Sequence, residues 1–351
     1  MQINNNNQAP SFKGLYDPNV LITGATGYIG SNLTGRLARE GYNCIIASRN
    51  QDKTAFLQRT IEAVNATKKN KSLFSFVNLD LTQPENLRDV FTKSKPIDAV
   101  VHLGGLTSNG QSFREAPLYW RTNVGGTQNL LDGMLEAGTD KILFMSTGST
   151  YGKLPDKTPI TELLVQNPET PYANTKLAAE RMIQDYEKSN TGLKSIILRL
   201  FNVAGTTSKD DLTPGINVIS VLFERIKSNS PFTLMGNKFD TPDGTCIKDF
   251  IHVSDVCEAA TKSLGVLLSN KKSNVFNLGS GEGTSLGTII RKGQEISGKG
   301  VQLAIKDAPE GETSVMIVDN SKIKKALSWR PKKTMDDILK STWEWIAGNS
   351  K

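Results

Sequence analysis

The chain has 351 residues, of which 37% are hydrophobic and 22% are charged, a composition typical of a globular protein with one large domain or two closely associated ones. It has no uninterrupted apolar run of about 18 residues, so we expect no membrane span. The net charge of +7 is too small to predict nucleic-acid binding. Three scattered cysteines and two histidines predict no disulfide framework and no metal site, and they favour a reducing cytoplasm.

Residues 1–16 form a polar segment that contains four consecutive asparagines. The segment lacks the basic and then apolar order of a secretion signal, so we expect a disordered lead-in. From residue 19 to about residue 200, short apolar runs alternate with longer amphipathic stretches, including those at 114–137 and 172–188. Strands are expected at 20–23, 44–47, 74–78, 99–103, 142–146 and 195–200. Such strands predict an α/β Rossmann fold, a doubly wound parallel sheet covered by helices on both faces.

The alternation stops after Phe201, where loops rich in glycine and proline extend from 205 to 245 before a helical pattern resumes near Val253. We therefore predict a Rossmann domain over 17–200, together with a returning segment at about 250–270. Residues 201–249 and 271–347 are expected to form a smaller α/β lobe that binds the substrate. The substrate cleft would lie between the two.

A glycine loop follows the first predicted strand and precedes the first predicted helix. Gly24 permits a tight turn, Gly27 lets backbone amides approach a diphosphate, and Gly30 lets the helix pack closely. Tyr28 and Ile29 lie within the loop, at the helix N-terminus that would face the anion. This order of elements predicts a dinucleotide cofactor.

The end of the second predicted strand carries no carboxylate, although a carboxylate there usually binds the adenosine 2′-hydroxyl of NAD. The sequence at this place is Ser48-Arg49-Asn50, and Arg49 is able to pair with the 2′-phosphate of NADP. NAD and NADP therefore both remain candidates, and Arg49 is alternatively an ordinary surface residue. Asp80, followed by Leu81, is placed either to meet the adenine amino group or to cap a helix.

Tyr172 and Lys176 lie four residues apart near the start of a predicted helix, so they share one face of it. A tyrosine with a pKa of about 10 is a poor base, but a neighbouring ammonium group and an oxidised nicotinamide favour the phenolate. We therefore predict that Lys176 lowers the pKa of Tyr172 and binds the nicotinamide ribose. Thr147 ends the preceding strand at the sheet edge where ligands bind, and it is the candidate proton relay.

These features together resemble the extended short-chain dehydrogenase/reductase family, and within it the UDP-glucose 4-epimerases. The similarity extends from about Val20 to Trp345. Further supporting motifs lie at 101–106, 123–127, 198–202, 243–253 and 276–279, and the motif at 243–253 is the most specific for this subgroup. The resemblance implies cofactor contacts at Leu103, Gly104, Gly105 and Asn123.

The resemblance also implies a mechanism, in which Tyr172 removes the proton of the C4 hydroxyl while a hydride passes to the nicotinamide. The 4-keto sugar turns over and takes the hydride back on its other face. Asn202 and Asn217 stand where such enzymes hold the sugar nucleotide, Met235 replaces an aromatic residue expected against the uracil, and Lys248 replaces an arginine on the diphosphate.

Three functions remain open from the sequence. The first is a nucleotide-sugar 4-epimerase with a retained cofactor, and its rival, favoured by Arg49, is an NADPH-dependent nucleotide-sugar ketoreductase. The third is a redox-sensing protein without catalysis. Related dehydratases carry an aspartate and a glutamate after the catalytic threonine, and this chain has Gly148 and Ser149 there. The resemblance further implies a homodimer formed through the helices at 114–137 and 172–188.

Overall fold

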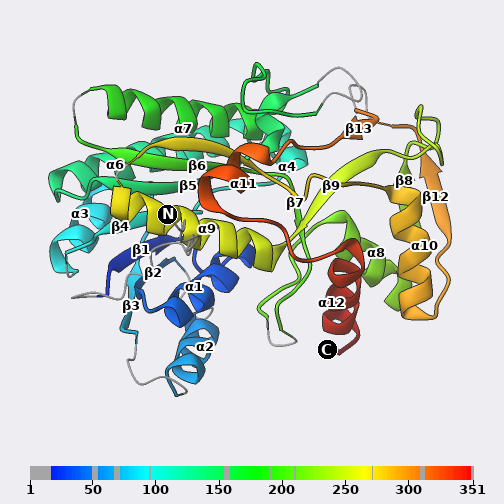
Figure 1. Ribbon diagram of the computed structural model, residues 1–351, viewed down its shortest axis with the longest axis horizontal. Helices are drawn as coiled ribbons and strands as arrows, with labels where there is room; N and C mark the ends of the chain where they lie inside the picture. The colour runs from blue at the N-terminus through cyan, green and yellow to red at the C-terminus, as the bar shows by residue number, and fades with distance from the viewer. Residues whose placement is uncertain are drawn as a thin grey trace, which may run out of the picture.

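The computed structural model describes residues 17–49, 54–66, 72–94, 96–153, 159–189, 191–208, 211–270, 272–308 and 313–348. The predicted lead-in at 1–16 lies outside these residues. A seven-stranded sheet occupies the centre of the larger part of the molecule, with all its neighbouring strands parallel (Figure 1). Its order is β10-β6-β5-β4-β1-β2-β3. The strands are β1 (Asn19–Thr23), β2 (Asn43–Ser48), β3 (Phe74–Asn78), β4 (Ala99–His102), β5 (Lys141–Thr147), β6 (Lys194–Leu200) and β10 (Asn274–Leu278).

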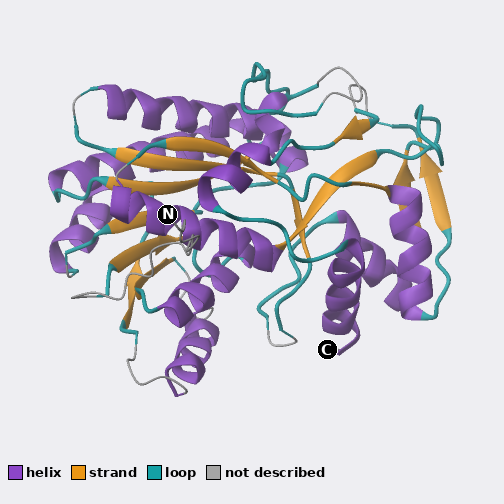
Figure 2. Ribbon diagram, viewed as in Figure 1, coloured by secondary structure: helices purple, strands orange, loops and turns teal. Residues whose placement is uncertain are grey.

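Helices cover both faces of this sheet (Figure 2). One apolar core lies beneath α1 (Tyr28–Glu40), α2 (Thr54–Ala66) and α9 (Val253–Asn270). The core on the other face is formed with α3 (Pro84–Lys93), α6 (Gly126–Glu136) and α7 (Pro171–Lys188). Strands buried on both sides read as continuous apolar runs, which is why their sequence indicated a parallel sheet. The predicted Rossmann class is confirmed.

The helical segment predicted at 114–137 is divided in the structure. It comprises the end of α4 (Asn109–Arg114), α5 (Ala116–Tyr119), the π-helix η1 (Trp120–Gly125) and then α6. Glu115 has non-helical backbone angles, and Pro117 stands in the first turn of α5. Proline has no backbone N–H to donate, so it suits the start of a helix better than its interior. Hydrophobic periodicity alone did not reveal this division.

The second lobe has its own apolar core, formed by α8 (Val218–Lys227), β8 (Phe232–Met235), α10 (Leu286–Ser297) and α12 (Met335–Gly348). β8 pairs in parallel with β12 (Leu303–Lys306) at the edge of the lobe farthest from α3 (Figure 1). β9 (Ile247–His252) is the centre of a mixed sheet. Its partners are β7 (Asn202–Ala204), β11 (Gly283–Ser285) and β13 (Val315–Met316).

The predicted boundary of the second lobe is wrong at one point. The prediction placed 271–347 in that lobe, but β10 pairs with β6 as the edge strand of the central sheet. In addition, α11 (Ser321–Leu327) and Trp329 pack into the core beneath α9. The chain therefore returns twice to the first domain, because β10 completes the sheet and α11 covers apolar surface there. None of the described helices is long and apolar enough to cross a membrane.

Candidate active site

The glycine loop joins β1 to α1 in the predicted way. Gly24 has a φ of +69°, and a Cβ there would lie 2.8 Å from the backbone nitrogen of Gly104. A Cβ at Gly30 would lie 2.1 Å from the carbonyl oxygen of Gly24. Gly27 is the N-cap of α1, no side chain caps that end, and the first turn, which holds Tyr28 and Ile29, has no acidic residue. The uncapped amides fit an anionic diphosphate.

Tyr28 has a role that the sequence did not reveal. Its hydroxyl donates a hydrogen bond of 2.5 Å to the carbonyl oxygen of Gly205, which follows β7. Burial raises the pKa of Tyr28 well above its usual value, so the phenol remains a neutral donor. Gly215 packs against the Tyr28 ring, since a Cβ there would lie 2.7 Å from Cδ1. Tyr28 therefore joins the glycine loop to the second lobe.

The end of β2 lies beside the glycine loop. Ser48 is buried, and its hydroxyl is 3.3 Å from that of Thr26 in the loop. Arg49 is exposed, and Asn50 lies outside the described residues. Asp80 accepts hydrogen bonds from the backbone and hydroxyl of Thr82, at 2.9 and 2.8 Å. The backbone bond lowers the pKa of Asp80, and the charge of Arg49 acts in the same direction, so Asp80 and Arg49 influence one another.

Asp80 does not cap α3, whose N-cap is Gln83. The adjacent Leu81 supports the next loop, because a Cβ added at Gly104 would lie 2.9 Å from its Cδ1. The loop of Leu103, Gly104 and Gly105 follows β4 at the same edge of the sheet as the glycine loop. These positions agree with a cofactor lying across the carboxyl ends of the strands.

Asn123 orders the loop after β4 from the π-helix η1. Its Oδ1 accepts from the backbone nitrogen of Leu106 at 2.8 Å, and its Nδ2 donates to the Leu106 carbonyl at 3.0 Å. The same Nδ2 donates to the hydroxyl of Thr175 on α7, also at 3.0 Å. The Asn123 amide therefore bonds to protein groups, and it connects the loop after β4 to α7.

The three predicted catalytic residues meet where β5 ends against the first turns of α7. Thr170 caps α7, accepting a hydrogen bond from the backbone nitrogen of Ala173 at 3.1 Å. The Thr147 hydroxyl donates to Oγ of Ser149 at 3.2 Å and lies close enough to Tyr172 to lower its pKa. Lys176 lies one turn along α7, 7% exposed, with its Nζ 4.0 Å from the centre of the Phe144 ring. The i, i+4 spacing and the parallel strand end thus bring these groups together.

Burial has opposite effects on the pKa values of Tyr172 and Lys176. Burial raises the pKa of Tyr172 to about 12, although the nearby Thr147 hydroxyl opposes that shift. Burial also lowers the pKa of Lys176 to about 7, with Glu180 acting in the opposite direction. The prediction combined the Lys176 ammonium with an oxidised nicotinamide. Within the protein itself, burial has the largest effect on the pKa of Tyr172.

A buried polar network behind the catalytic pair was absent from the sequence prediction. Glu180 and Arg199 form an ion pair of 2.7 Å, and their side chains are 1% and 6% exposed. Arg199 donates to the hydroxyl of Tyr151 at 2.8 Å, and that hydroxyl donates to Asn277 on β10 at 2.7 Å. Two sequence features could have indicated this network. One is the four-residue spacing of Lys176 and Glu180, and the other is Arg199 within an otherwise apolar strand.

The four predicted substrate residues lie in the second lobe, and the structure engages three of them with protein groups. Asn202 donates from Nδ2 to the carbonyl oxygen of Asp249 at 2.8 Å. Asn217 caps α8, where its Oδ1 accepts two backbone N–H groups at 3.0 Å. Lys248 donates to the carbonyl oxygen of Thr313 at 3.1 Å. Met235 ends β8 and is 40% exposed. Among the described residues, no hydrogen bond joins these four to the catalytic three.

The position after Thr147 is too crowded for the aspartate found in dehydratases. A Cβ at Gly148 would lie 2.9 Å from Cζ of Phe201, which is buried. A larger side chain there would have to displace an aromatic ring in a packed core, which is costly. The structure therefore gives a steric reason for glycine at this position.

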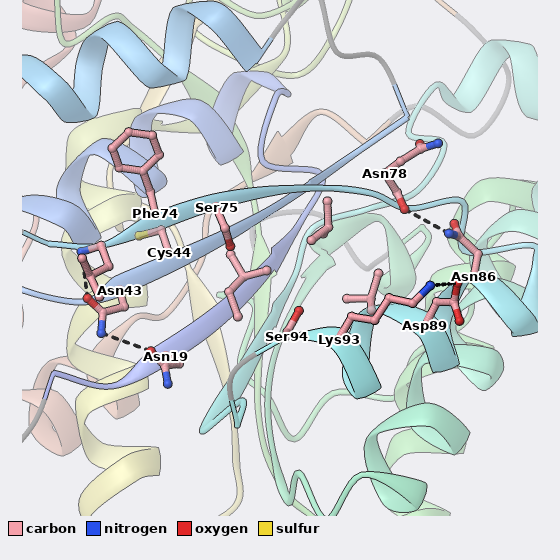
Figure 3. Close-up of a pocket in the computed structure, with 14 residues that line it drawn as sticks. Asn19, Asn43, Cys44, Phe74, Ser75, Asn78, Asn86, Asp89, Lys93 and Ser94 are labelled. Carbon is pink, nitrogen blue, oxygen red and sulfur yellow. Dashed lines mark hydrogen bonds and ion pairs between the residues drawn. The ribbon is translucent and has the colours of Figure 1, made fainter.

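A separate groove of about 620 Å³ lies on the sheet face beside α3. Figure 3 shows it between β2 and β3 on one side and α3 on the other, with Asn78 bonded to Asn86 and Lys93 paired with Asp89. None of the predicted cofactor, substrate or catalytic residues lines it.

The sequence profile of the NAD dependent epimerase/dehydratase family matches residues 20–279. The chain belongs to this family. A relative is the UDP-glucose 4-epimerase 2 of Arabidopsis thaliana, 31% identical over 338 residues, with 94% of this chain and 95% of the relative covered. The UDP-glucose 4-epimerase of Bacillus subtilis is 30% identical over 341 residues, and the alignment covers 94% of this chain and 97% of that relative.

Solved structures of the family agree with this assignment. A UDP-glucose 4-epimerase from Stenotrophomonas maltophila, with bound NAD and formylated UDP-arabinopyranose, superposes with a TM-score of 0.85. It is 28% identical, and the match covers 94% of this chain and 98% of that one. The Bifidobacterium longum enzyme in complex with NAD⁺ and UDP has a TM-score of 0.82 at 28% identity, covering 94% and 98%. The family resemblance predicted from the sequence is confirmed.

Proposed function

We propose that this protein is a nucleotide-sugar 4-epimerase that acts on UDP-glucose or a similar substrate with a bound NAD or NADP. The observation that carries the proposal is the convergence of Tyr172, Thr147 and Lys176 at the same edge of the parallel sheet as the glycine loop. Similarity to UDP-glucose 4-epimerases over more than nine-tenths of the chain supports it.

A bound NAD or NADP, held at the glycine loop of Gly24, Gly27 and Gly30, would supply the hydride acceptor and donor for C4 of the sugar. Tyr172 takes the proton of the C4 hydroxyl and later gives it back, while the nearby Thr147 hydroxyl favours the phenolate. Because burial raises the pKa of Tyr172 to about 12, the phenolate needs positive charge beside it. Protonated Lys176 supplies part of that charge within the protein. No net oxidation or reduction results.

Arg49 favours a second candidate, an NADPH-dependent nucleotide-sugar ketoreductase. Its exposed guanidinium follows β2, where a 2′-phosphate would lie, and no carboxylate precedes it at Ser48. A dissociable NADPH suits net reduction, whereas a retained cofactor suits epimerisation. With a 4-keto nucleotide sugar, a reductase consumes one NADPH for each sugar, and an epimerase shows no such stoichiometric consumption.

The proposal is tested with Tyr172→Phe and a control on the same helix. Tyr186→Phe is the control, because the Tyr186 hydroxyl donates to Asp132 at 2.6 Å on the exposed side of α7. Interconversion of UDP-glucose and UDP-galactose, followed by chromatography, should fall about 10²- to 10⁴-fold in Tyr172→Phe. The control should retain its turnover. An unaltered rate in Tyr172→Phe would refute the proposal.

We also infer a homodimer and a location in the cytoplasm. Phe113, Leu118 and Trp120 are 63%, 41% and 45% exposed on α4, α5 and η1, at the start of the segment 114–137 that the family resemblance assigns to dimerisation. A contiguous group of large apolar side chains at a surface is typical of an interface. No disulfide joins Cys44, Cys246 and Cys257, in keeping with a reducing compartment.

A further inference from the structure

Glu180 lies on α7 directly behind the catalytic pair, one turn after Lys176 and two turns after Tyr172. Its carboxylate is held from β6 by Arg199. The Arg199 Nη2 lies 2.7 Å from Oε2, and Nε lies 3.2 and 3.1 Å from the two carboxylate oxygens. A pair with this many contacts is rigid, because the planar guanidinium fixes the carboxylate in one orientation.

The same carboxylate reaches the strand that carries Thr147. Oε1 accepts a hydrogen bond from the hydroxyl of Ser146, the residue directly before Thr147 on β5. Oε2 also accepts from Nε2 of Gln166 at 3.2 Å. Glu180 therefore connects the helix that bears Tyr172 to the strand end that bears Thr147.

The charged and titratable groups that act on Lys176 are few. Glu180 comes from its own helix, and His102 faces it from β4. His102 is neutral, because burial lowers its pKa to about 3 and its two ring nitrogens contact Thr23 and Thr127. Tyr172 is a neutral phenol in the free protein. The negative charge that favours protonated Lys176 thus comes from Glu180.

We propose that Glu180, oriented by Arg199 and Ser146, is a positioning residue that places a negative charge one helical turn from Lys176 and holds Tyr172 in register with Thr147. The inference rests on the proposed function and extends it to a group that does not touch the substrate. A purely structural ion pair would stabilise the fold equally well without influencing Lys176. Removing the Glu180 charge should change the titration of Lys176 if Glu180 is a positioning residue, and should leave it unchanged if the ion pair is purely structural.

The first test is a ¹³C NMR titration of lysine side chains in the full chain as purified, with the Lys176 signal assigned by its loss in Lys176→Met. Glu180→Gln retains the shape and removes the charge, so the Lys176 midpoint should move to lower pH. Glu180→Asp retains the charge and should restore the midpoint. Glu187→Gln is the matched control, since Glu187 lies on α7 and accepts from the backbone of Ser195.

The second test measures turnover. The kcat of Glu180→Gln should fall about 10- to 100-fold at neutral pH, while KM changes less than about threefold, because catalytic alignment is lost and the binding surface is not. If the unpaired Arg199 prevents folding, the double variant Glu180→Gln with Arg199→Met removes both charges. The Lys176 midpoint should still fall in that variant, but by less than in Glu180→Gln, because Glu180 raises the Lys176 pKa and loss of the more distant guanidinium charge acts in the opposite direction.

The outcomes separate the two proposals. An unchanged Lys176 midpoint in both the Glu180→Gln and the double variant, with only lower thermal stability, would overturn the positioning role. Absence of epimerase and reductase turnover in the unaltered protein would overturn the proposed function. The NMR titration would then still decide whether Glu180 controls Lys176.

Discussion

At the scale of single residues, burial determines the chemistry of the site. Tyr172 and Lys176 are both desolvated, and desolvation favours the neutral form of each. The free protein therefore holds a neutral phenol beside a lysine that titrates near pH 7. An added positive charge close to Tyr172 shifts this balance toward the phenolate. A bound cofactor and the residues around Tyr172 thus both influence whether the Tyr172 phenol carries its proton.

Arg49 allows a prediction about which cofactor the protein selects. Arg49→Ala removes the group placed to meet a 2′-phosphate, and a hydrogen bond to a charged group contributes about 1.5–3 kcal/mol. By isothermal titration calorimetry, the NADPH affinity should fall roughly 10- to 100-fold, whereas the NADH affinity should change little. Arg59→Ala on the exposed side of α2 is the control of equal charge. An equal loss for both cofactors would show that Arg49 does not discriminate between them.

At the scale of elements, α1 is positioned by close backbone contact rather than by side chains. A Cβ at Gly30 would overlap the carbonyl oxygen of Gly24, and it would lie 2.9 Å from Cα of Ala25. These are backbone atoms, which yield far less easily than the end of a side chain. The helix N-terminus and the turn of the glycine loop therefore have to move together.

Gly30→Ala should consequently destabilise the fold and impair cofactor binding. Overpacking against backbone costs about 1–3 kcal/mol, which urea unfolding measures directly. Gly35→Ala, in the same helix, is the control. Its nearest neighbours are Thr60 Cγ2 at 3.3 Å and Arg39 Nη2 at 3.8 Å, both side-chain atoms. Alanine at position 35 should leave the free energy of unfolding unchanged or raise it slightly, since alanine forms helices better than glycine does. Equal effects of the two substitutions would contradict the close-contact explanation.

At the scale of the whole molecule, the two lobes are joined by specific polar contacts. The Tyr28 hydroxyl bonds to Gly205, and Asp249 on β9 accepts from the backbone nitrogens of Ser280, Gly281 and Val318. Burial raises the pKa of Asp249 to about 6, against hydrogen bonds that lower it. These contacts connect the mixed sheet around β9 to the end of β10 in the central sheet.

The proposed dimer makes a prediction at this scale. Trp120→Glu places a charge within the exposed apolar group on α4, α5 and η1, so a dimer formed there should dissociate. Sedimentation velocity at micromolar concentration should then show a monomer. Ile305→Glu on β12, where the side chain is 55% exposed in the second lobe, should leave the mass unchanged. A Trp120→Glu dimer, or a monomeric unaltered protein, would refute the proposed interface.

The alternation of strands and helices up to about residue 200, the glycine loop and the Tyr172–Lys176 pair were determined by the amino-acid sequence itself. All of them depend on local rules, namely hydrophobic periodicity, loop chemistry and an i, i+4 spacing. Only the tertiary structure decided that β10 completes the central sheet, that Asn217 caps α8 and that Glu180 pairs with Arg199 behind the site. Burial and pairing between distant segments depend on the packing of the whole chain, which also buries Tyr172 and thereby raises its pKa.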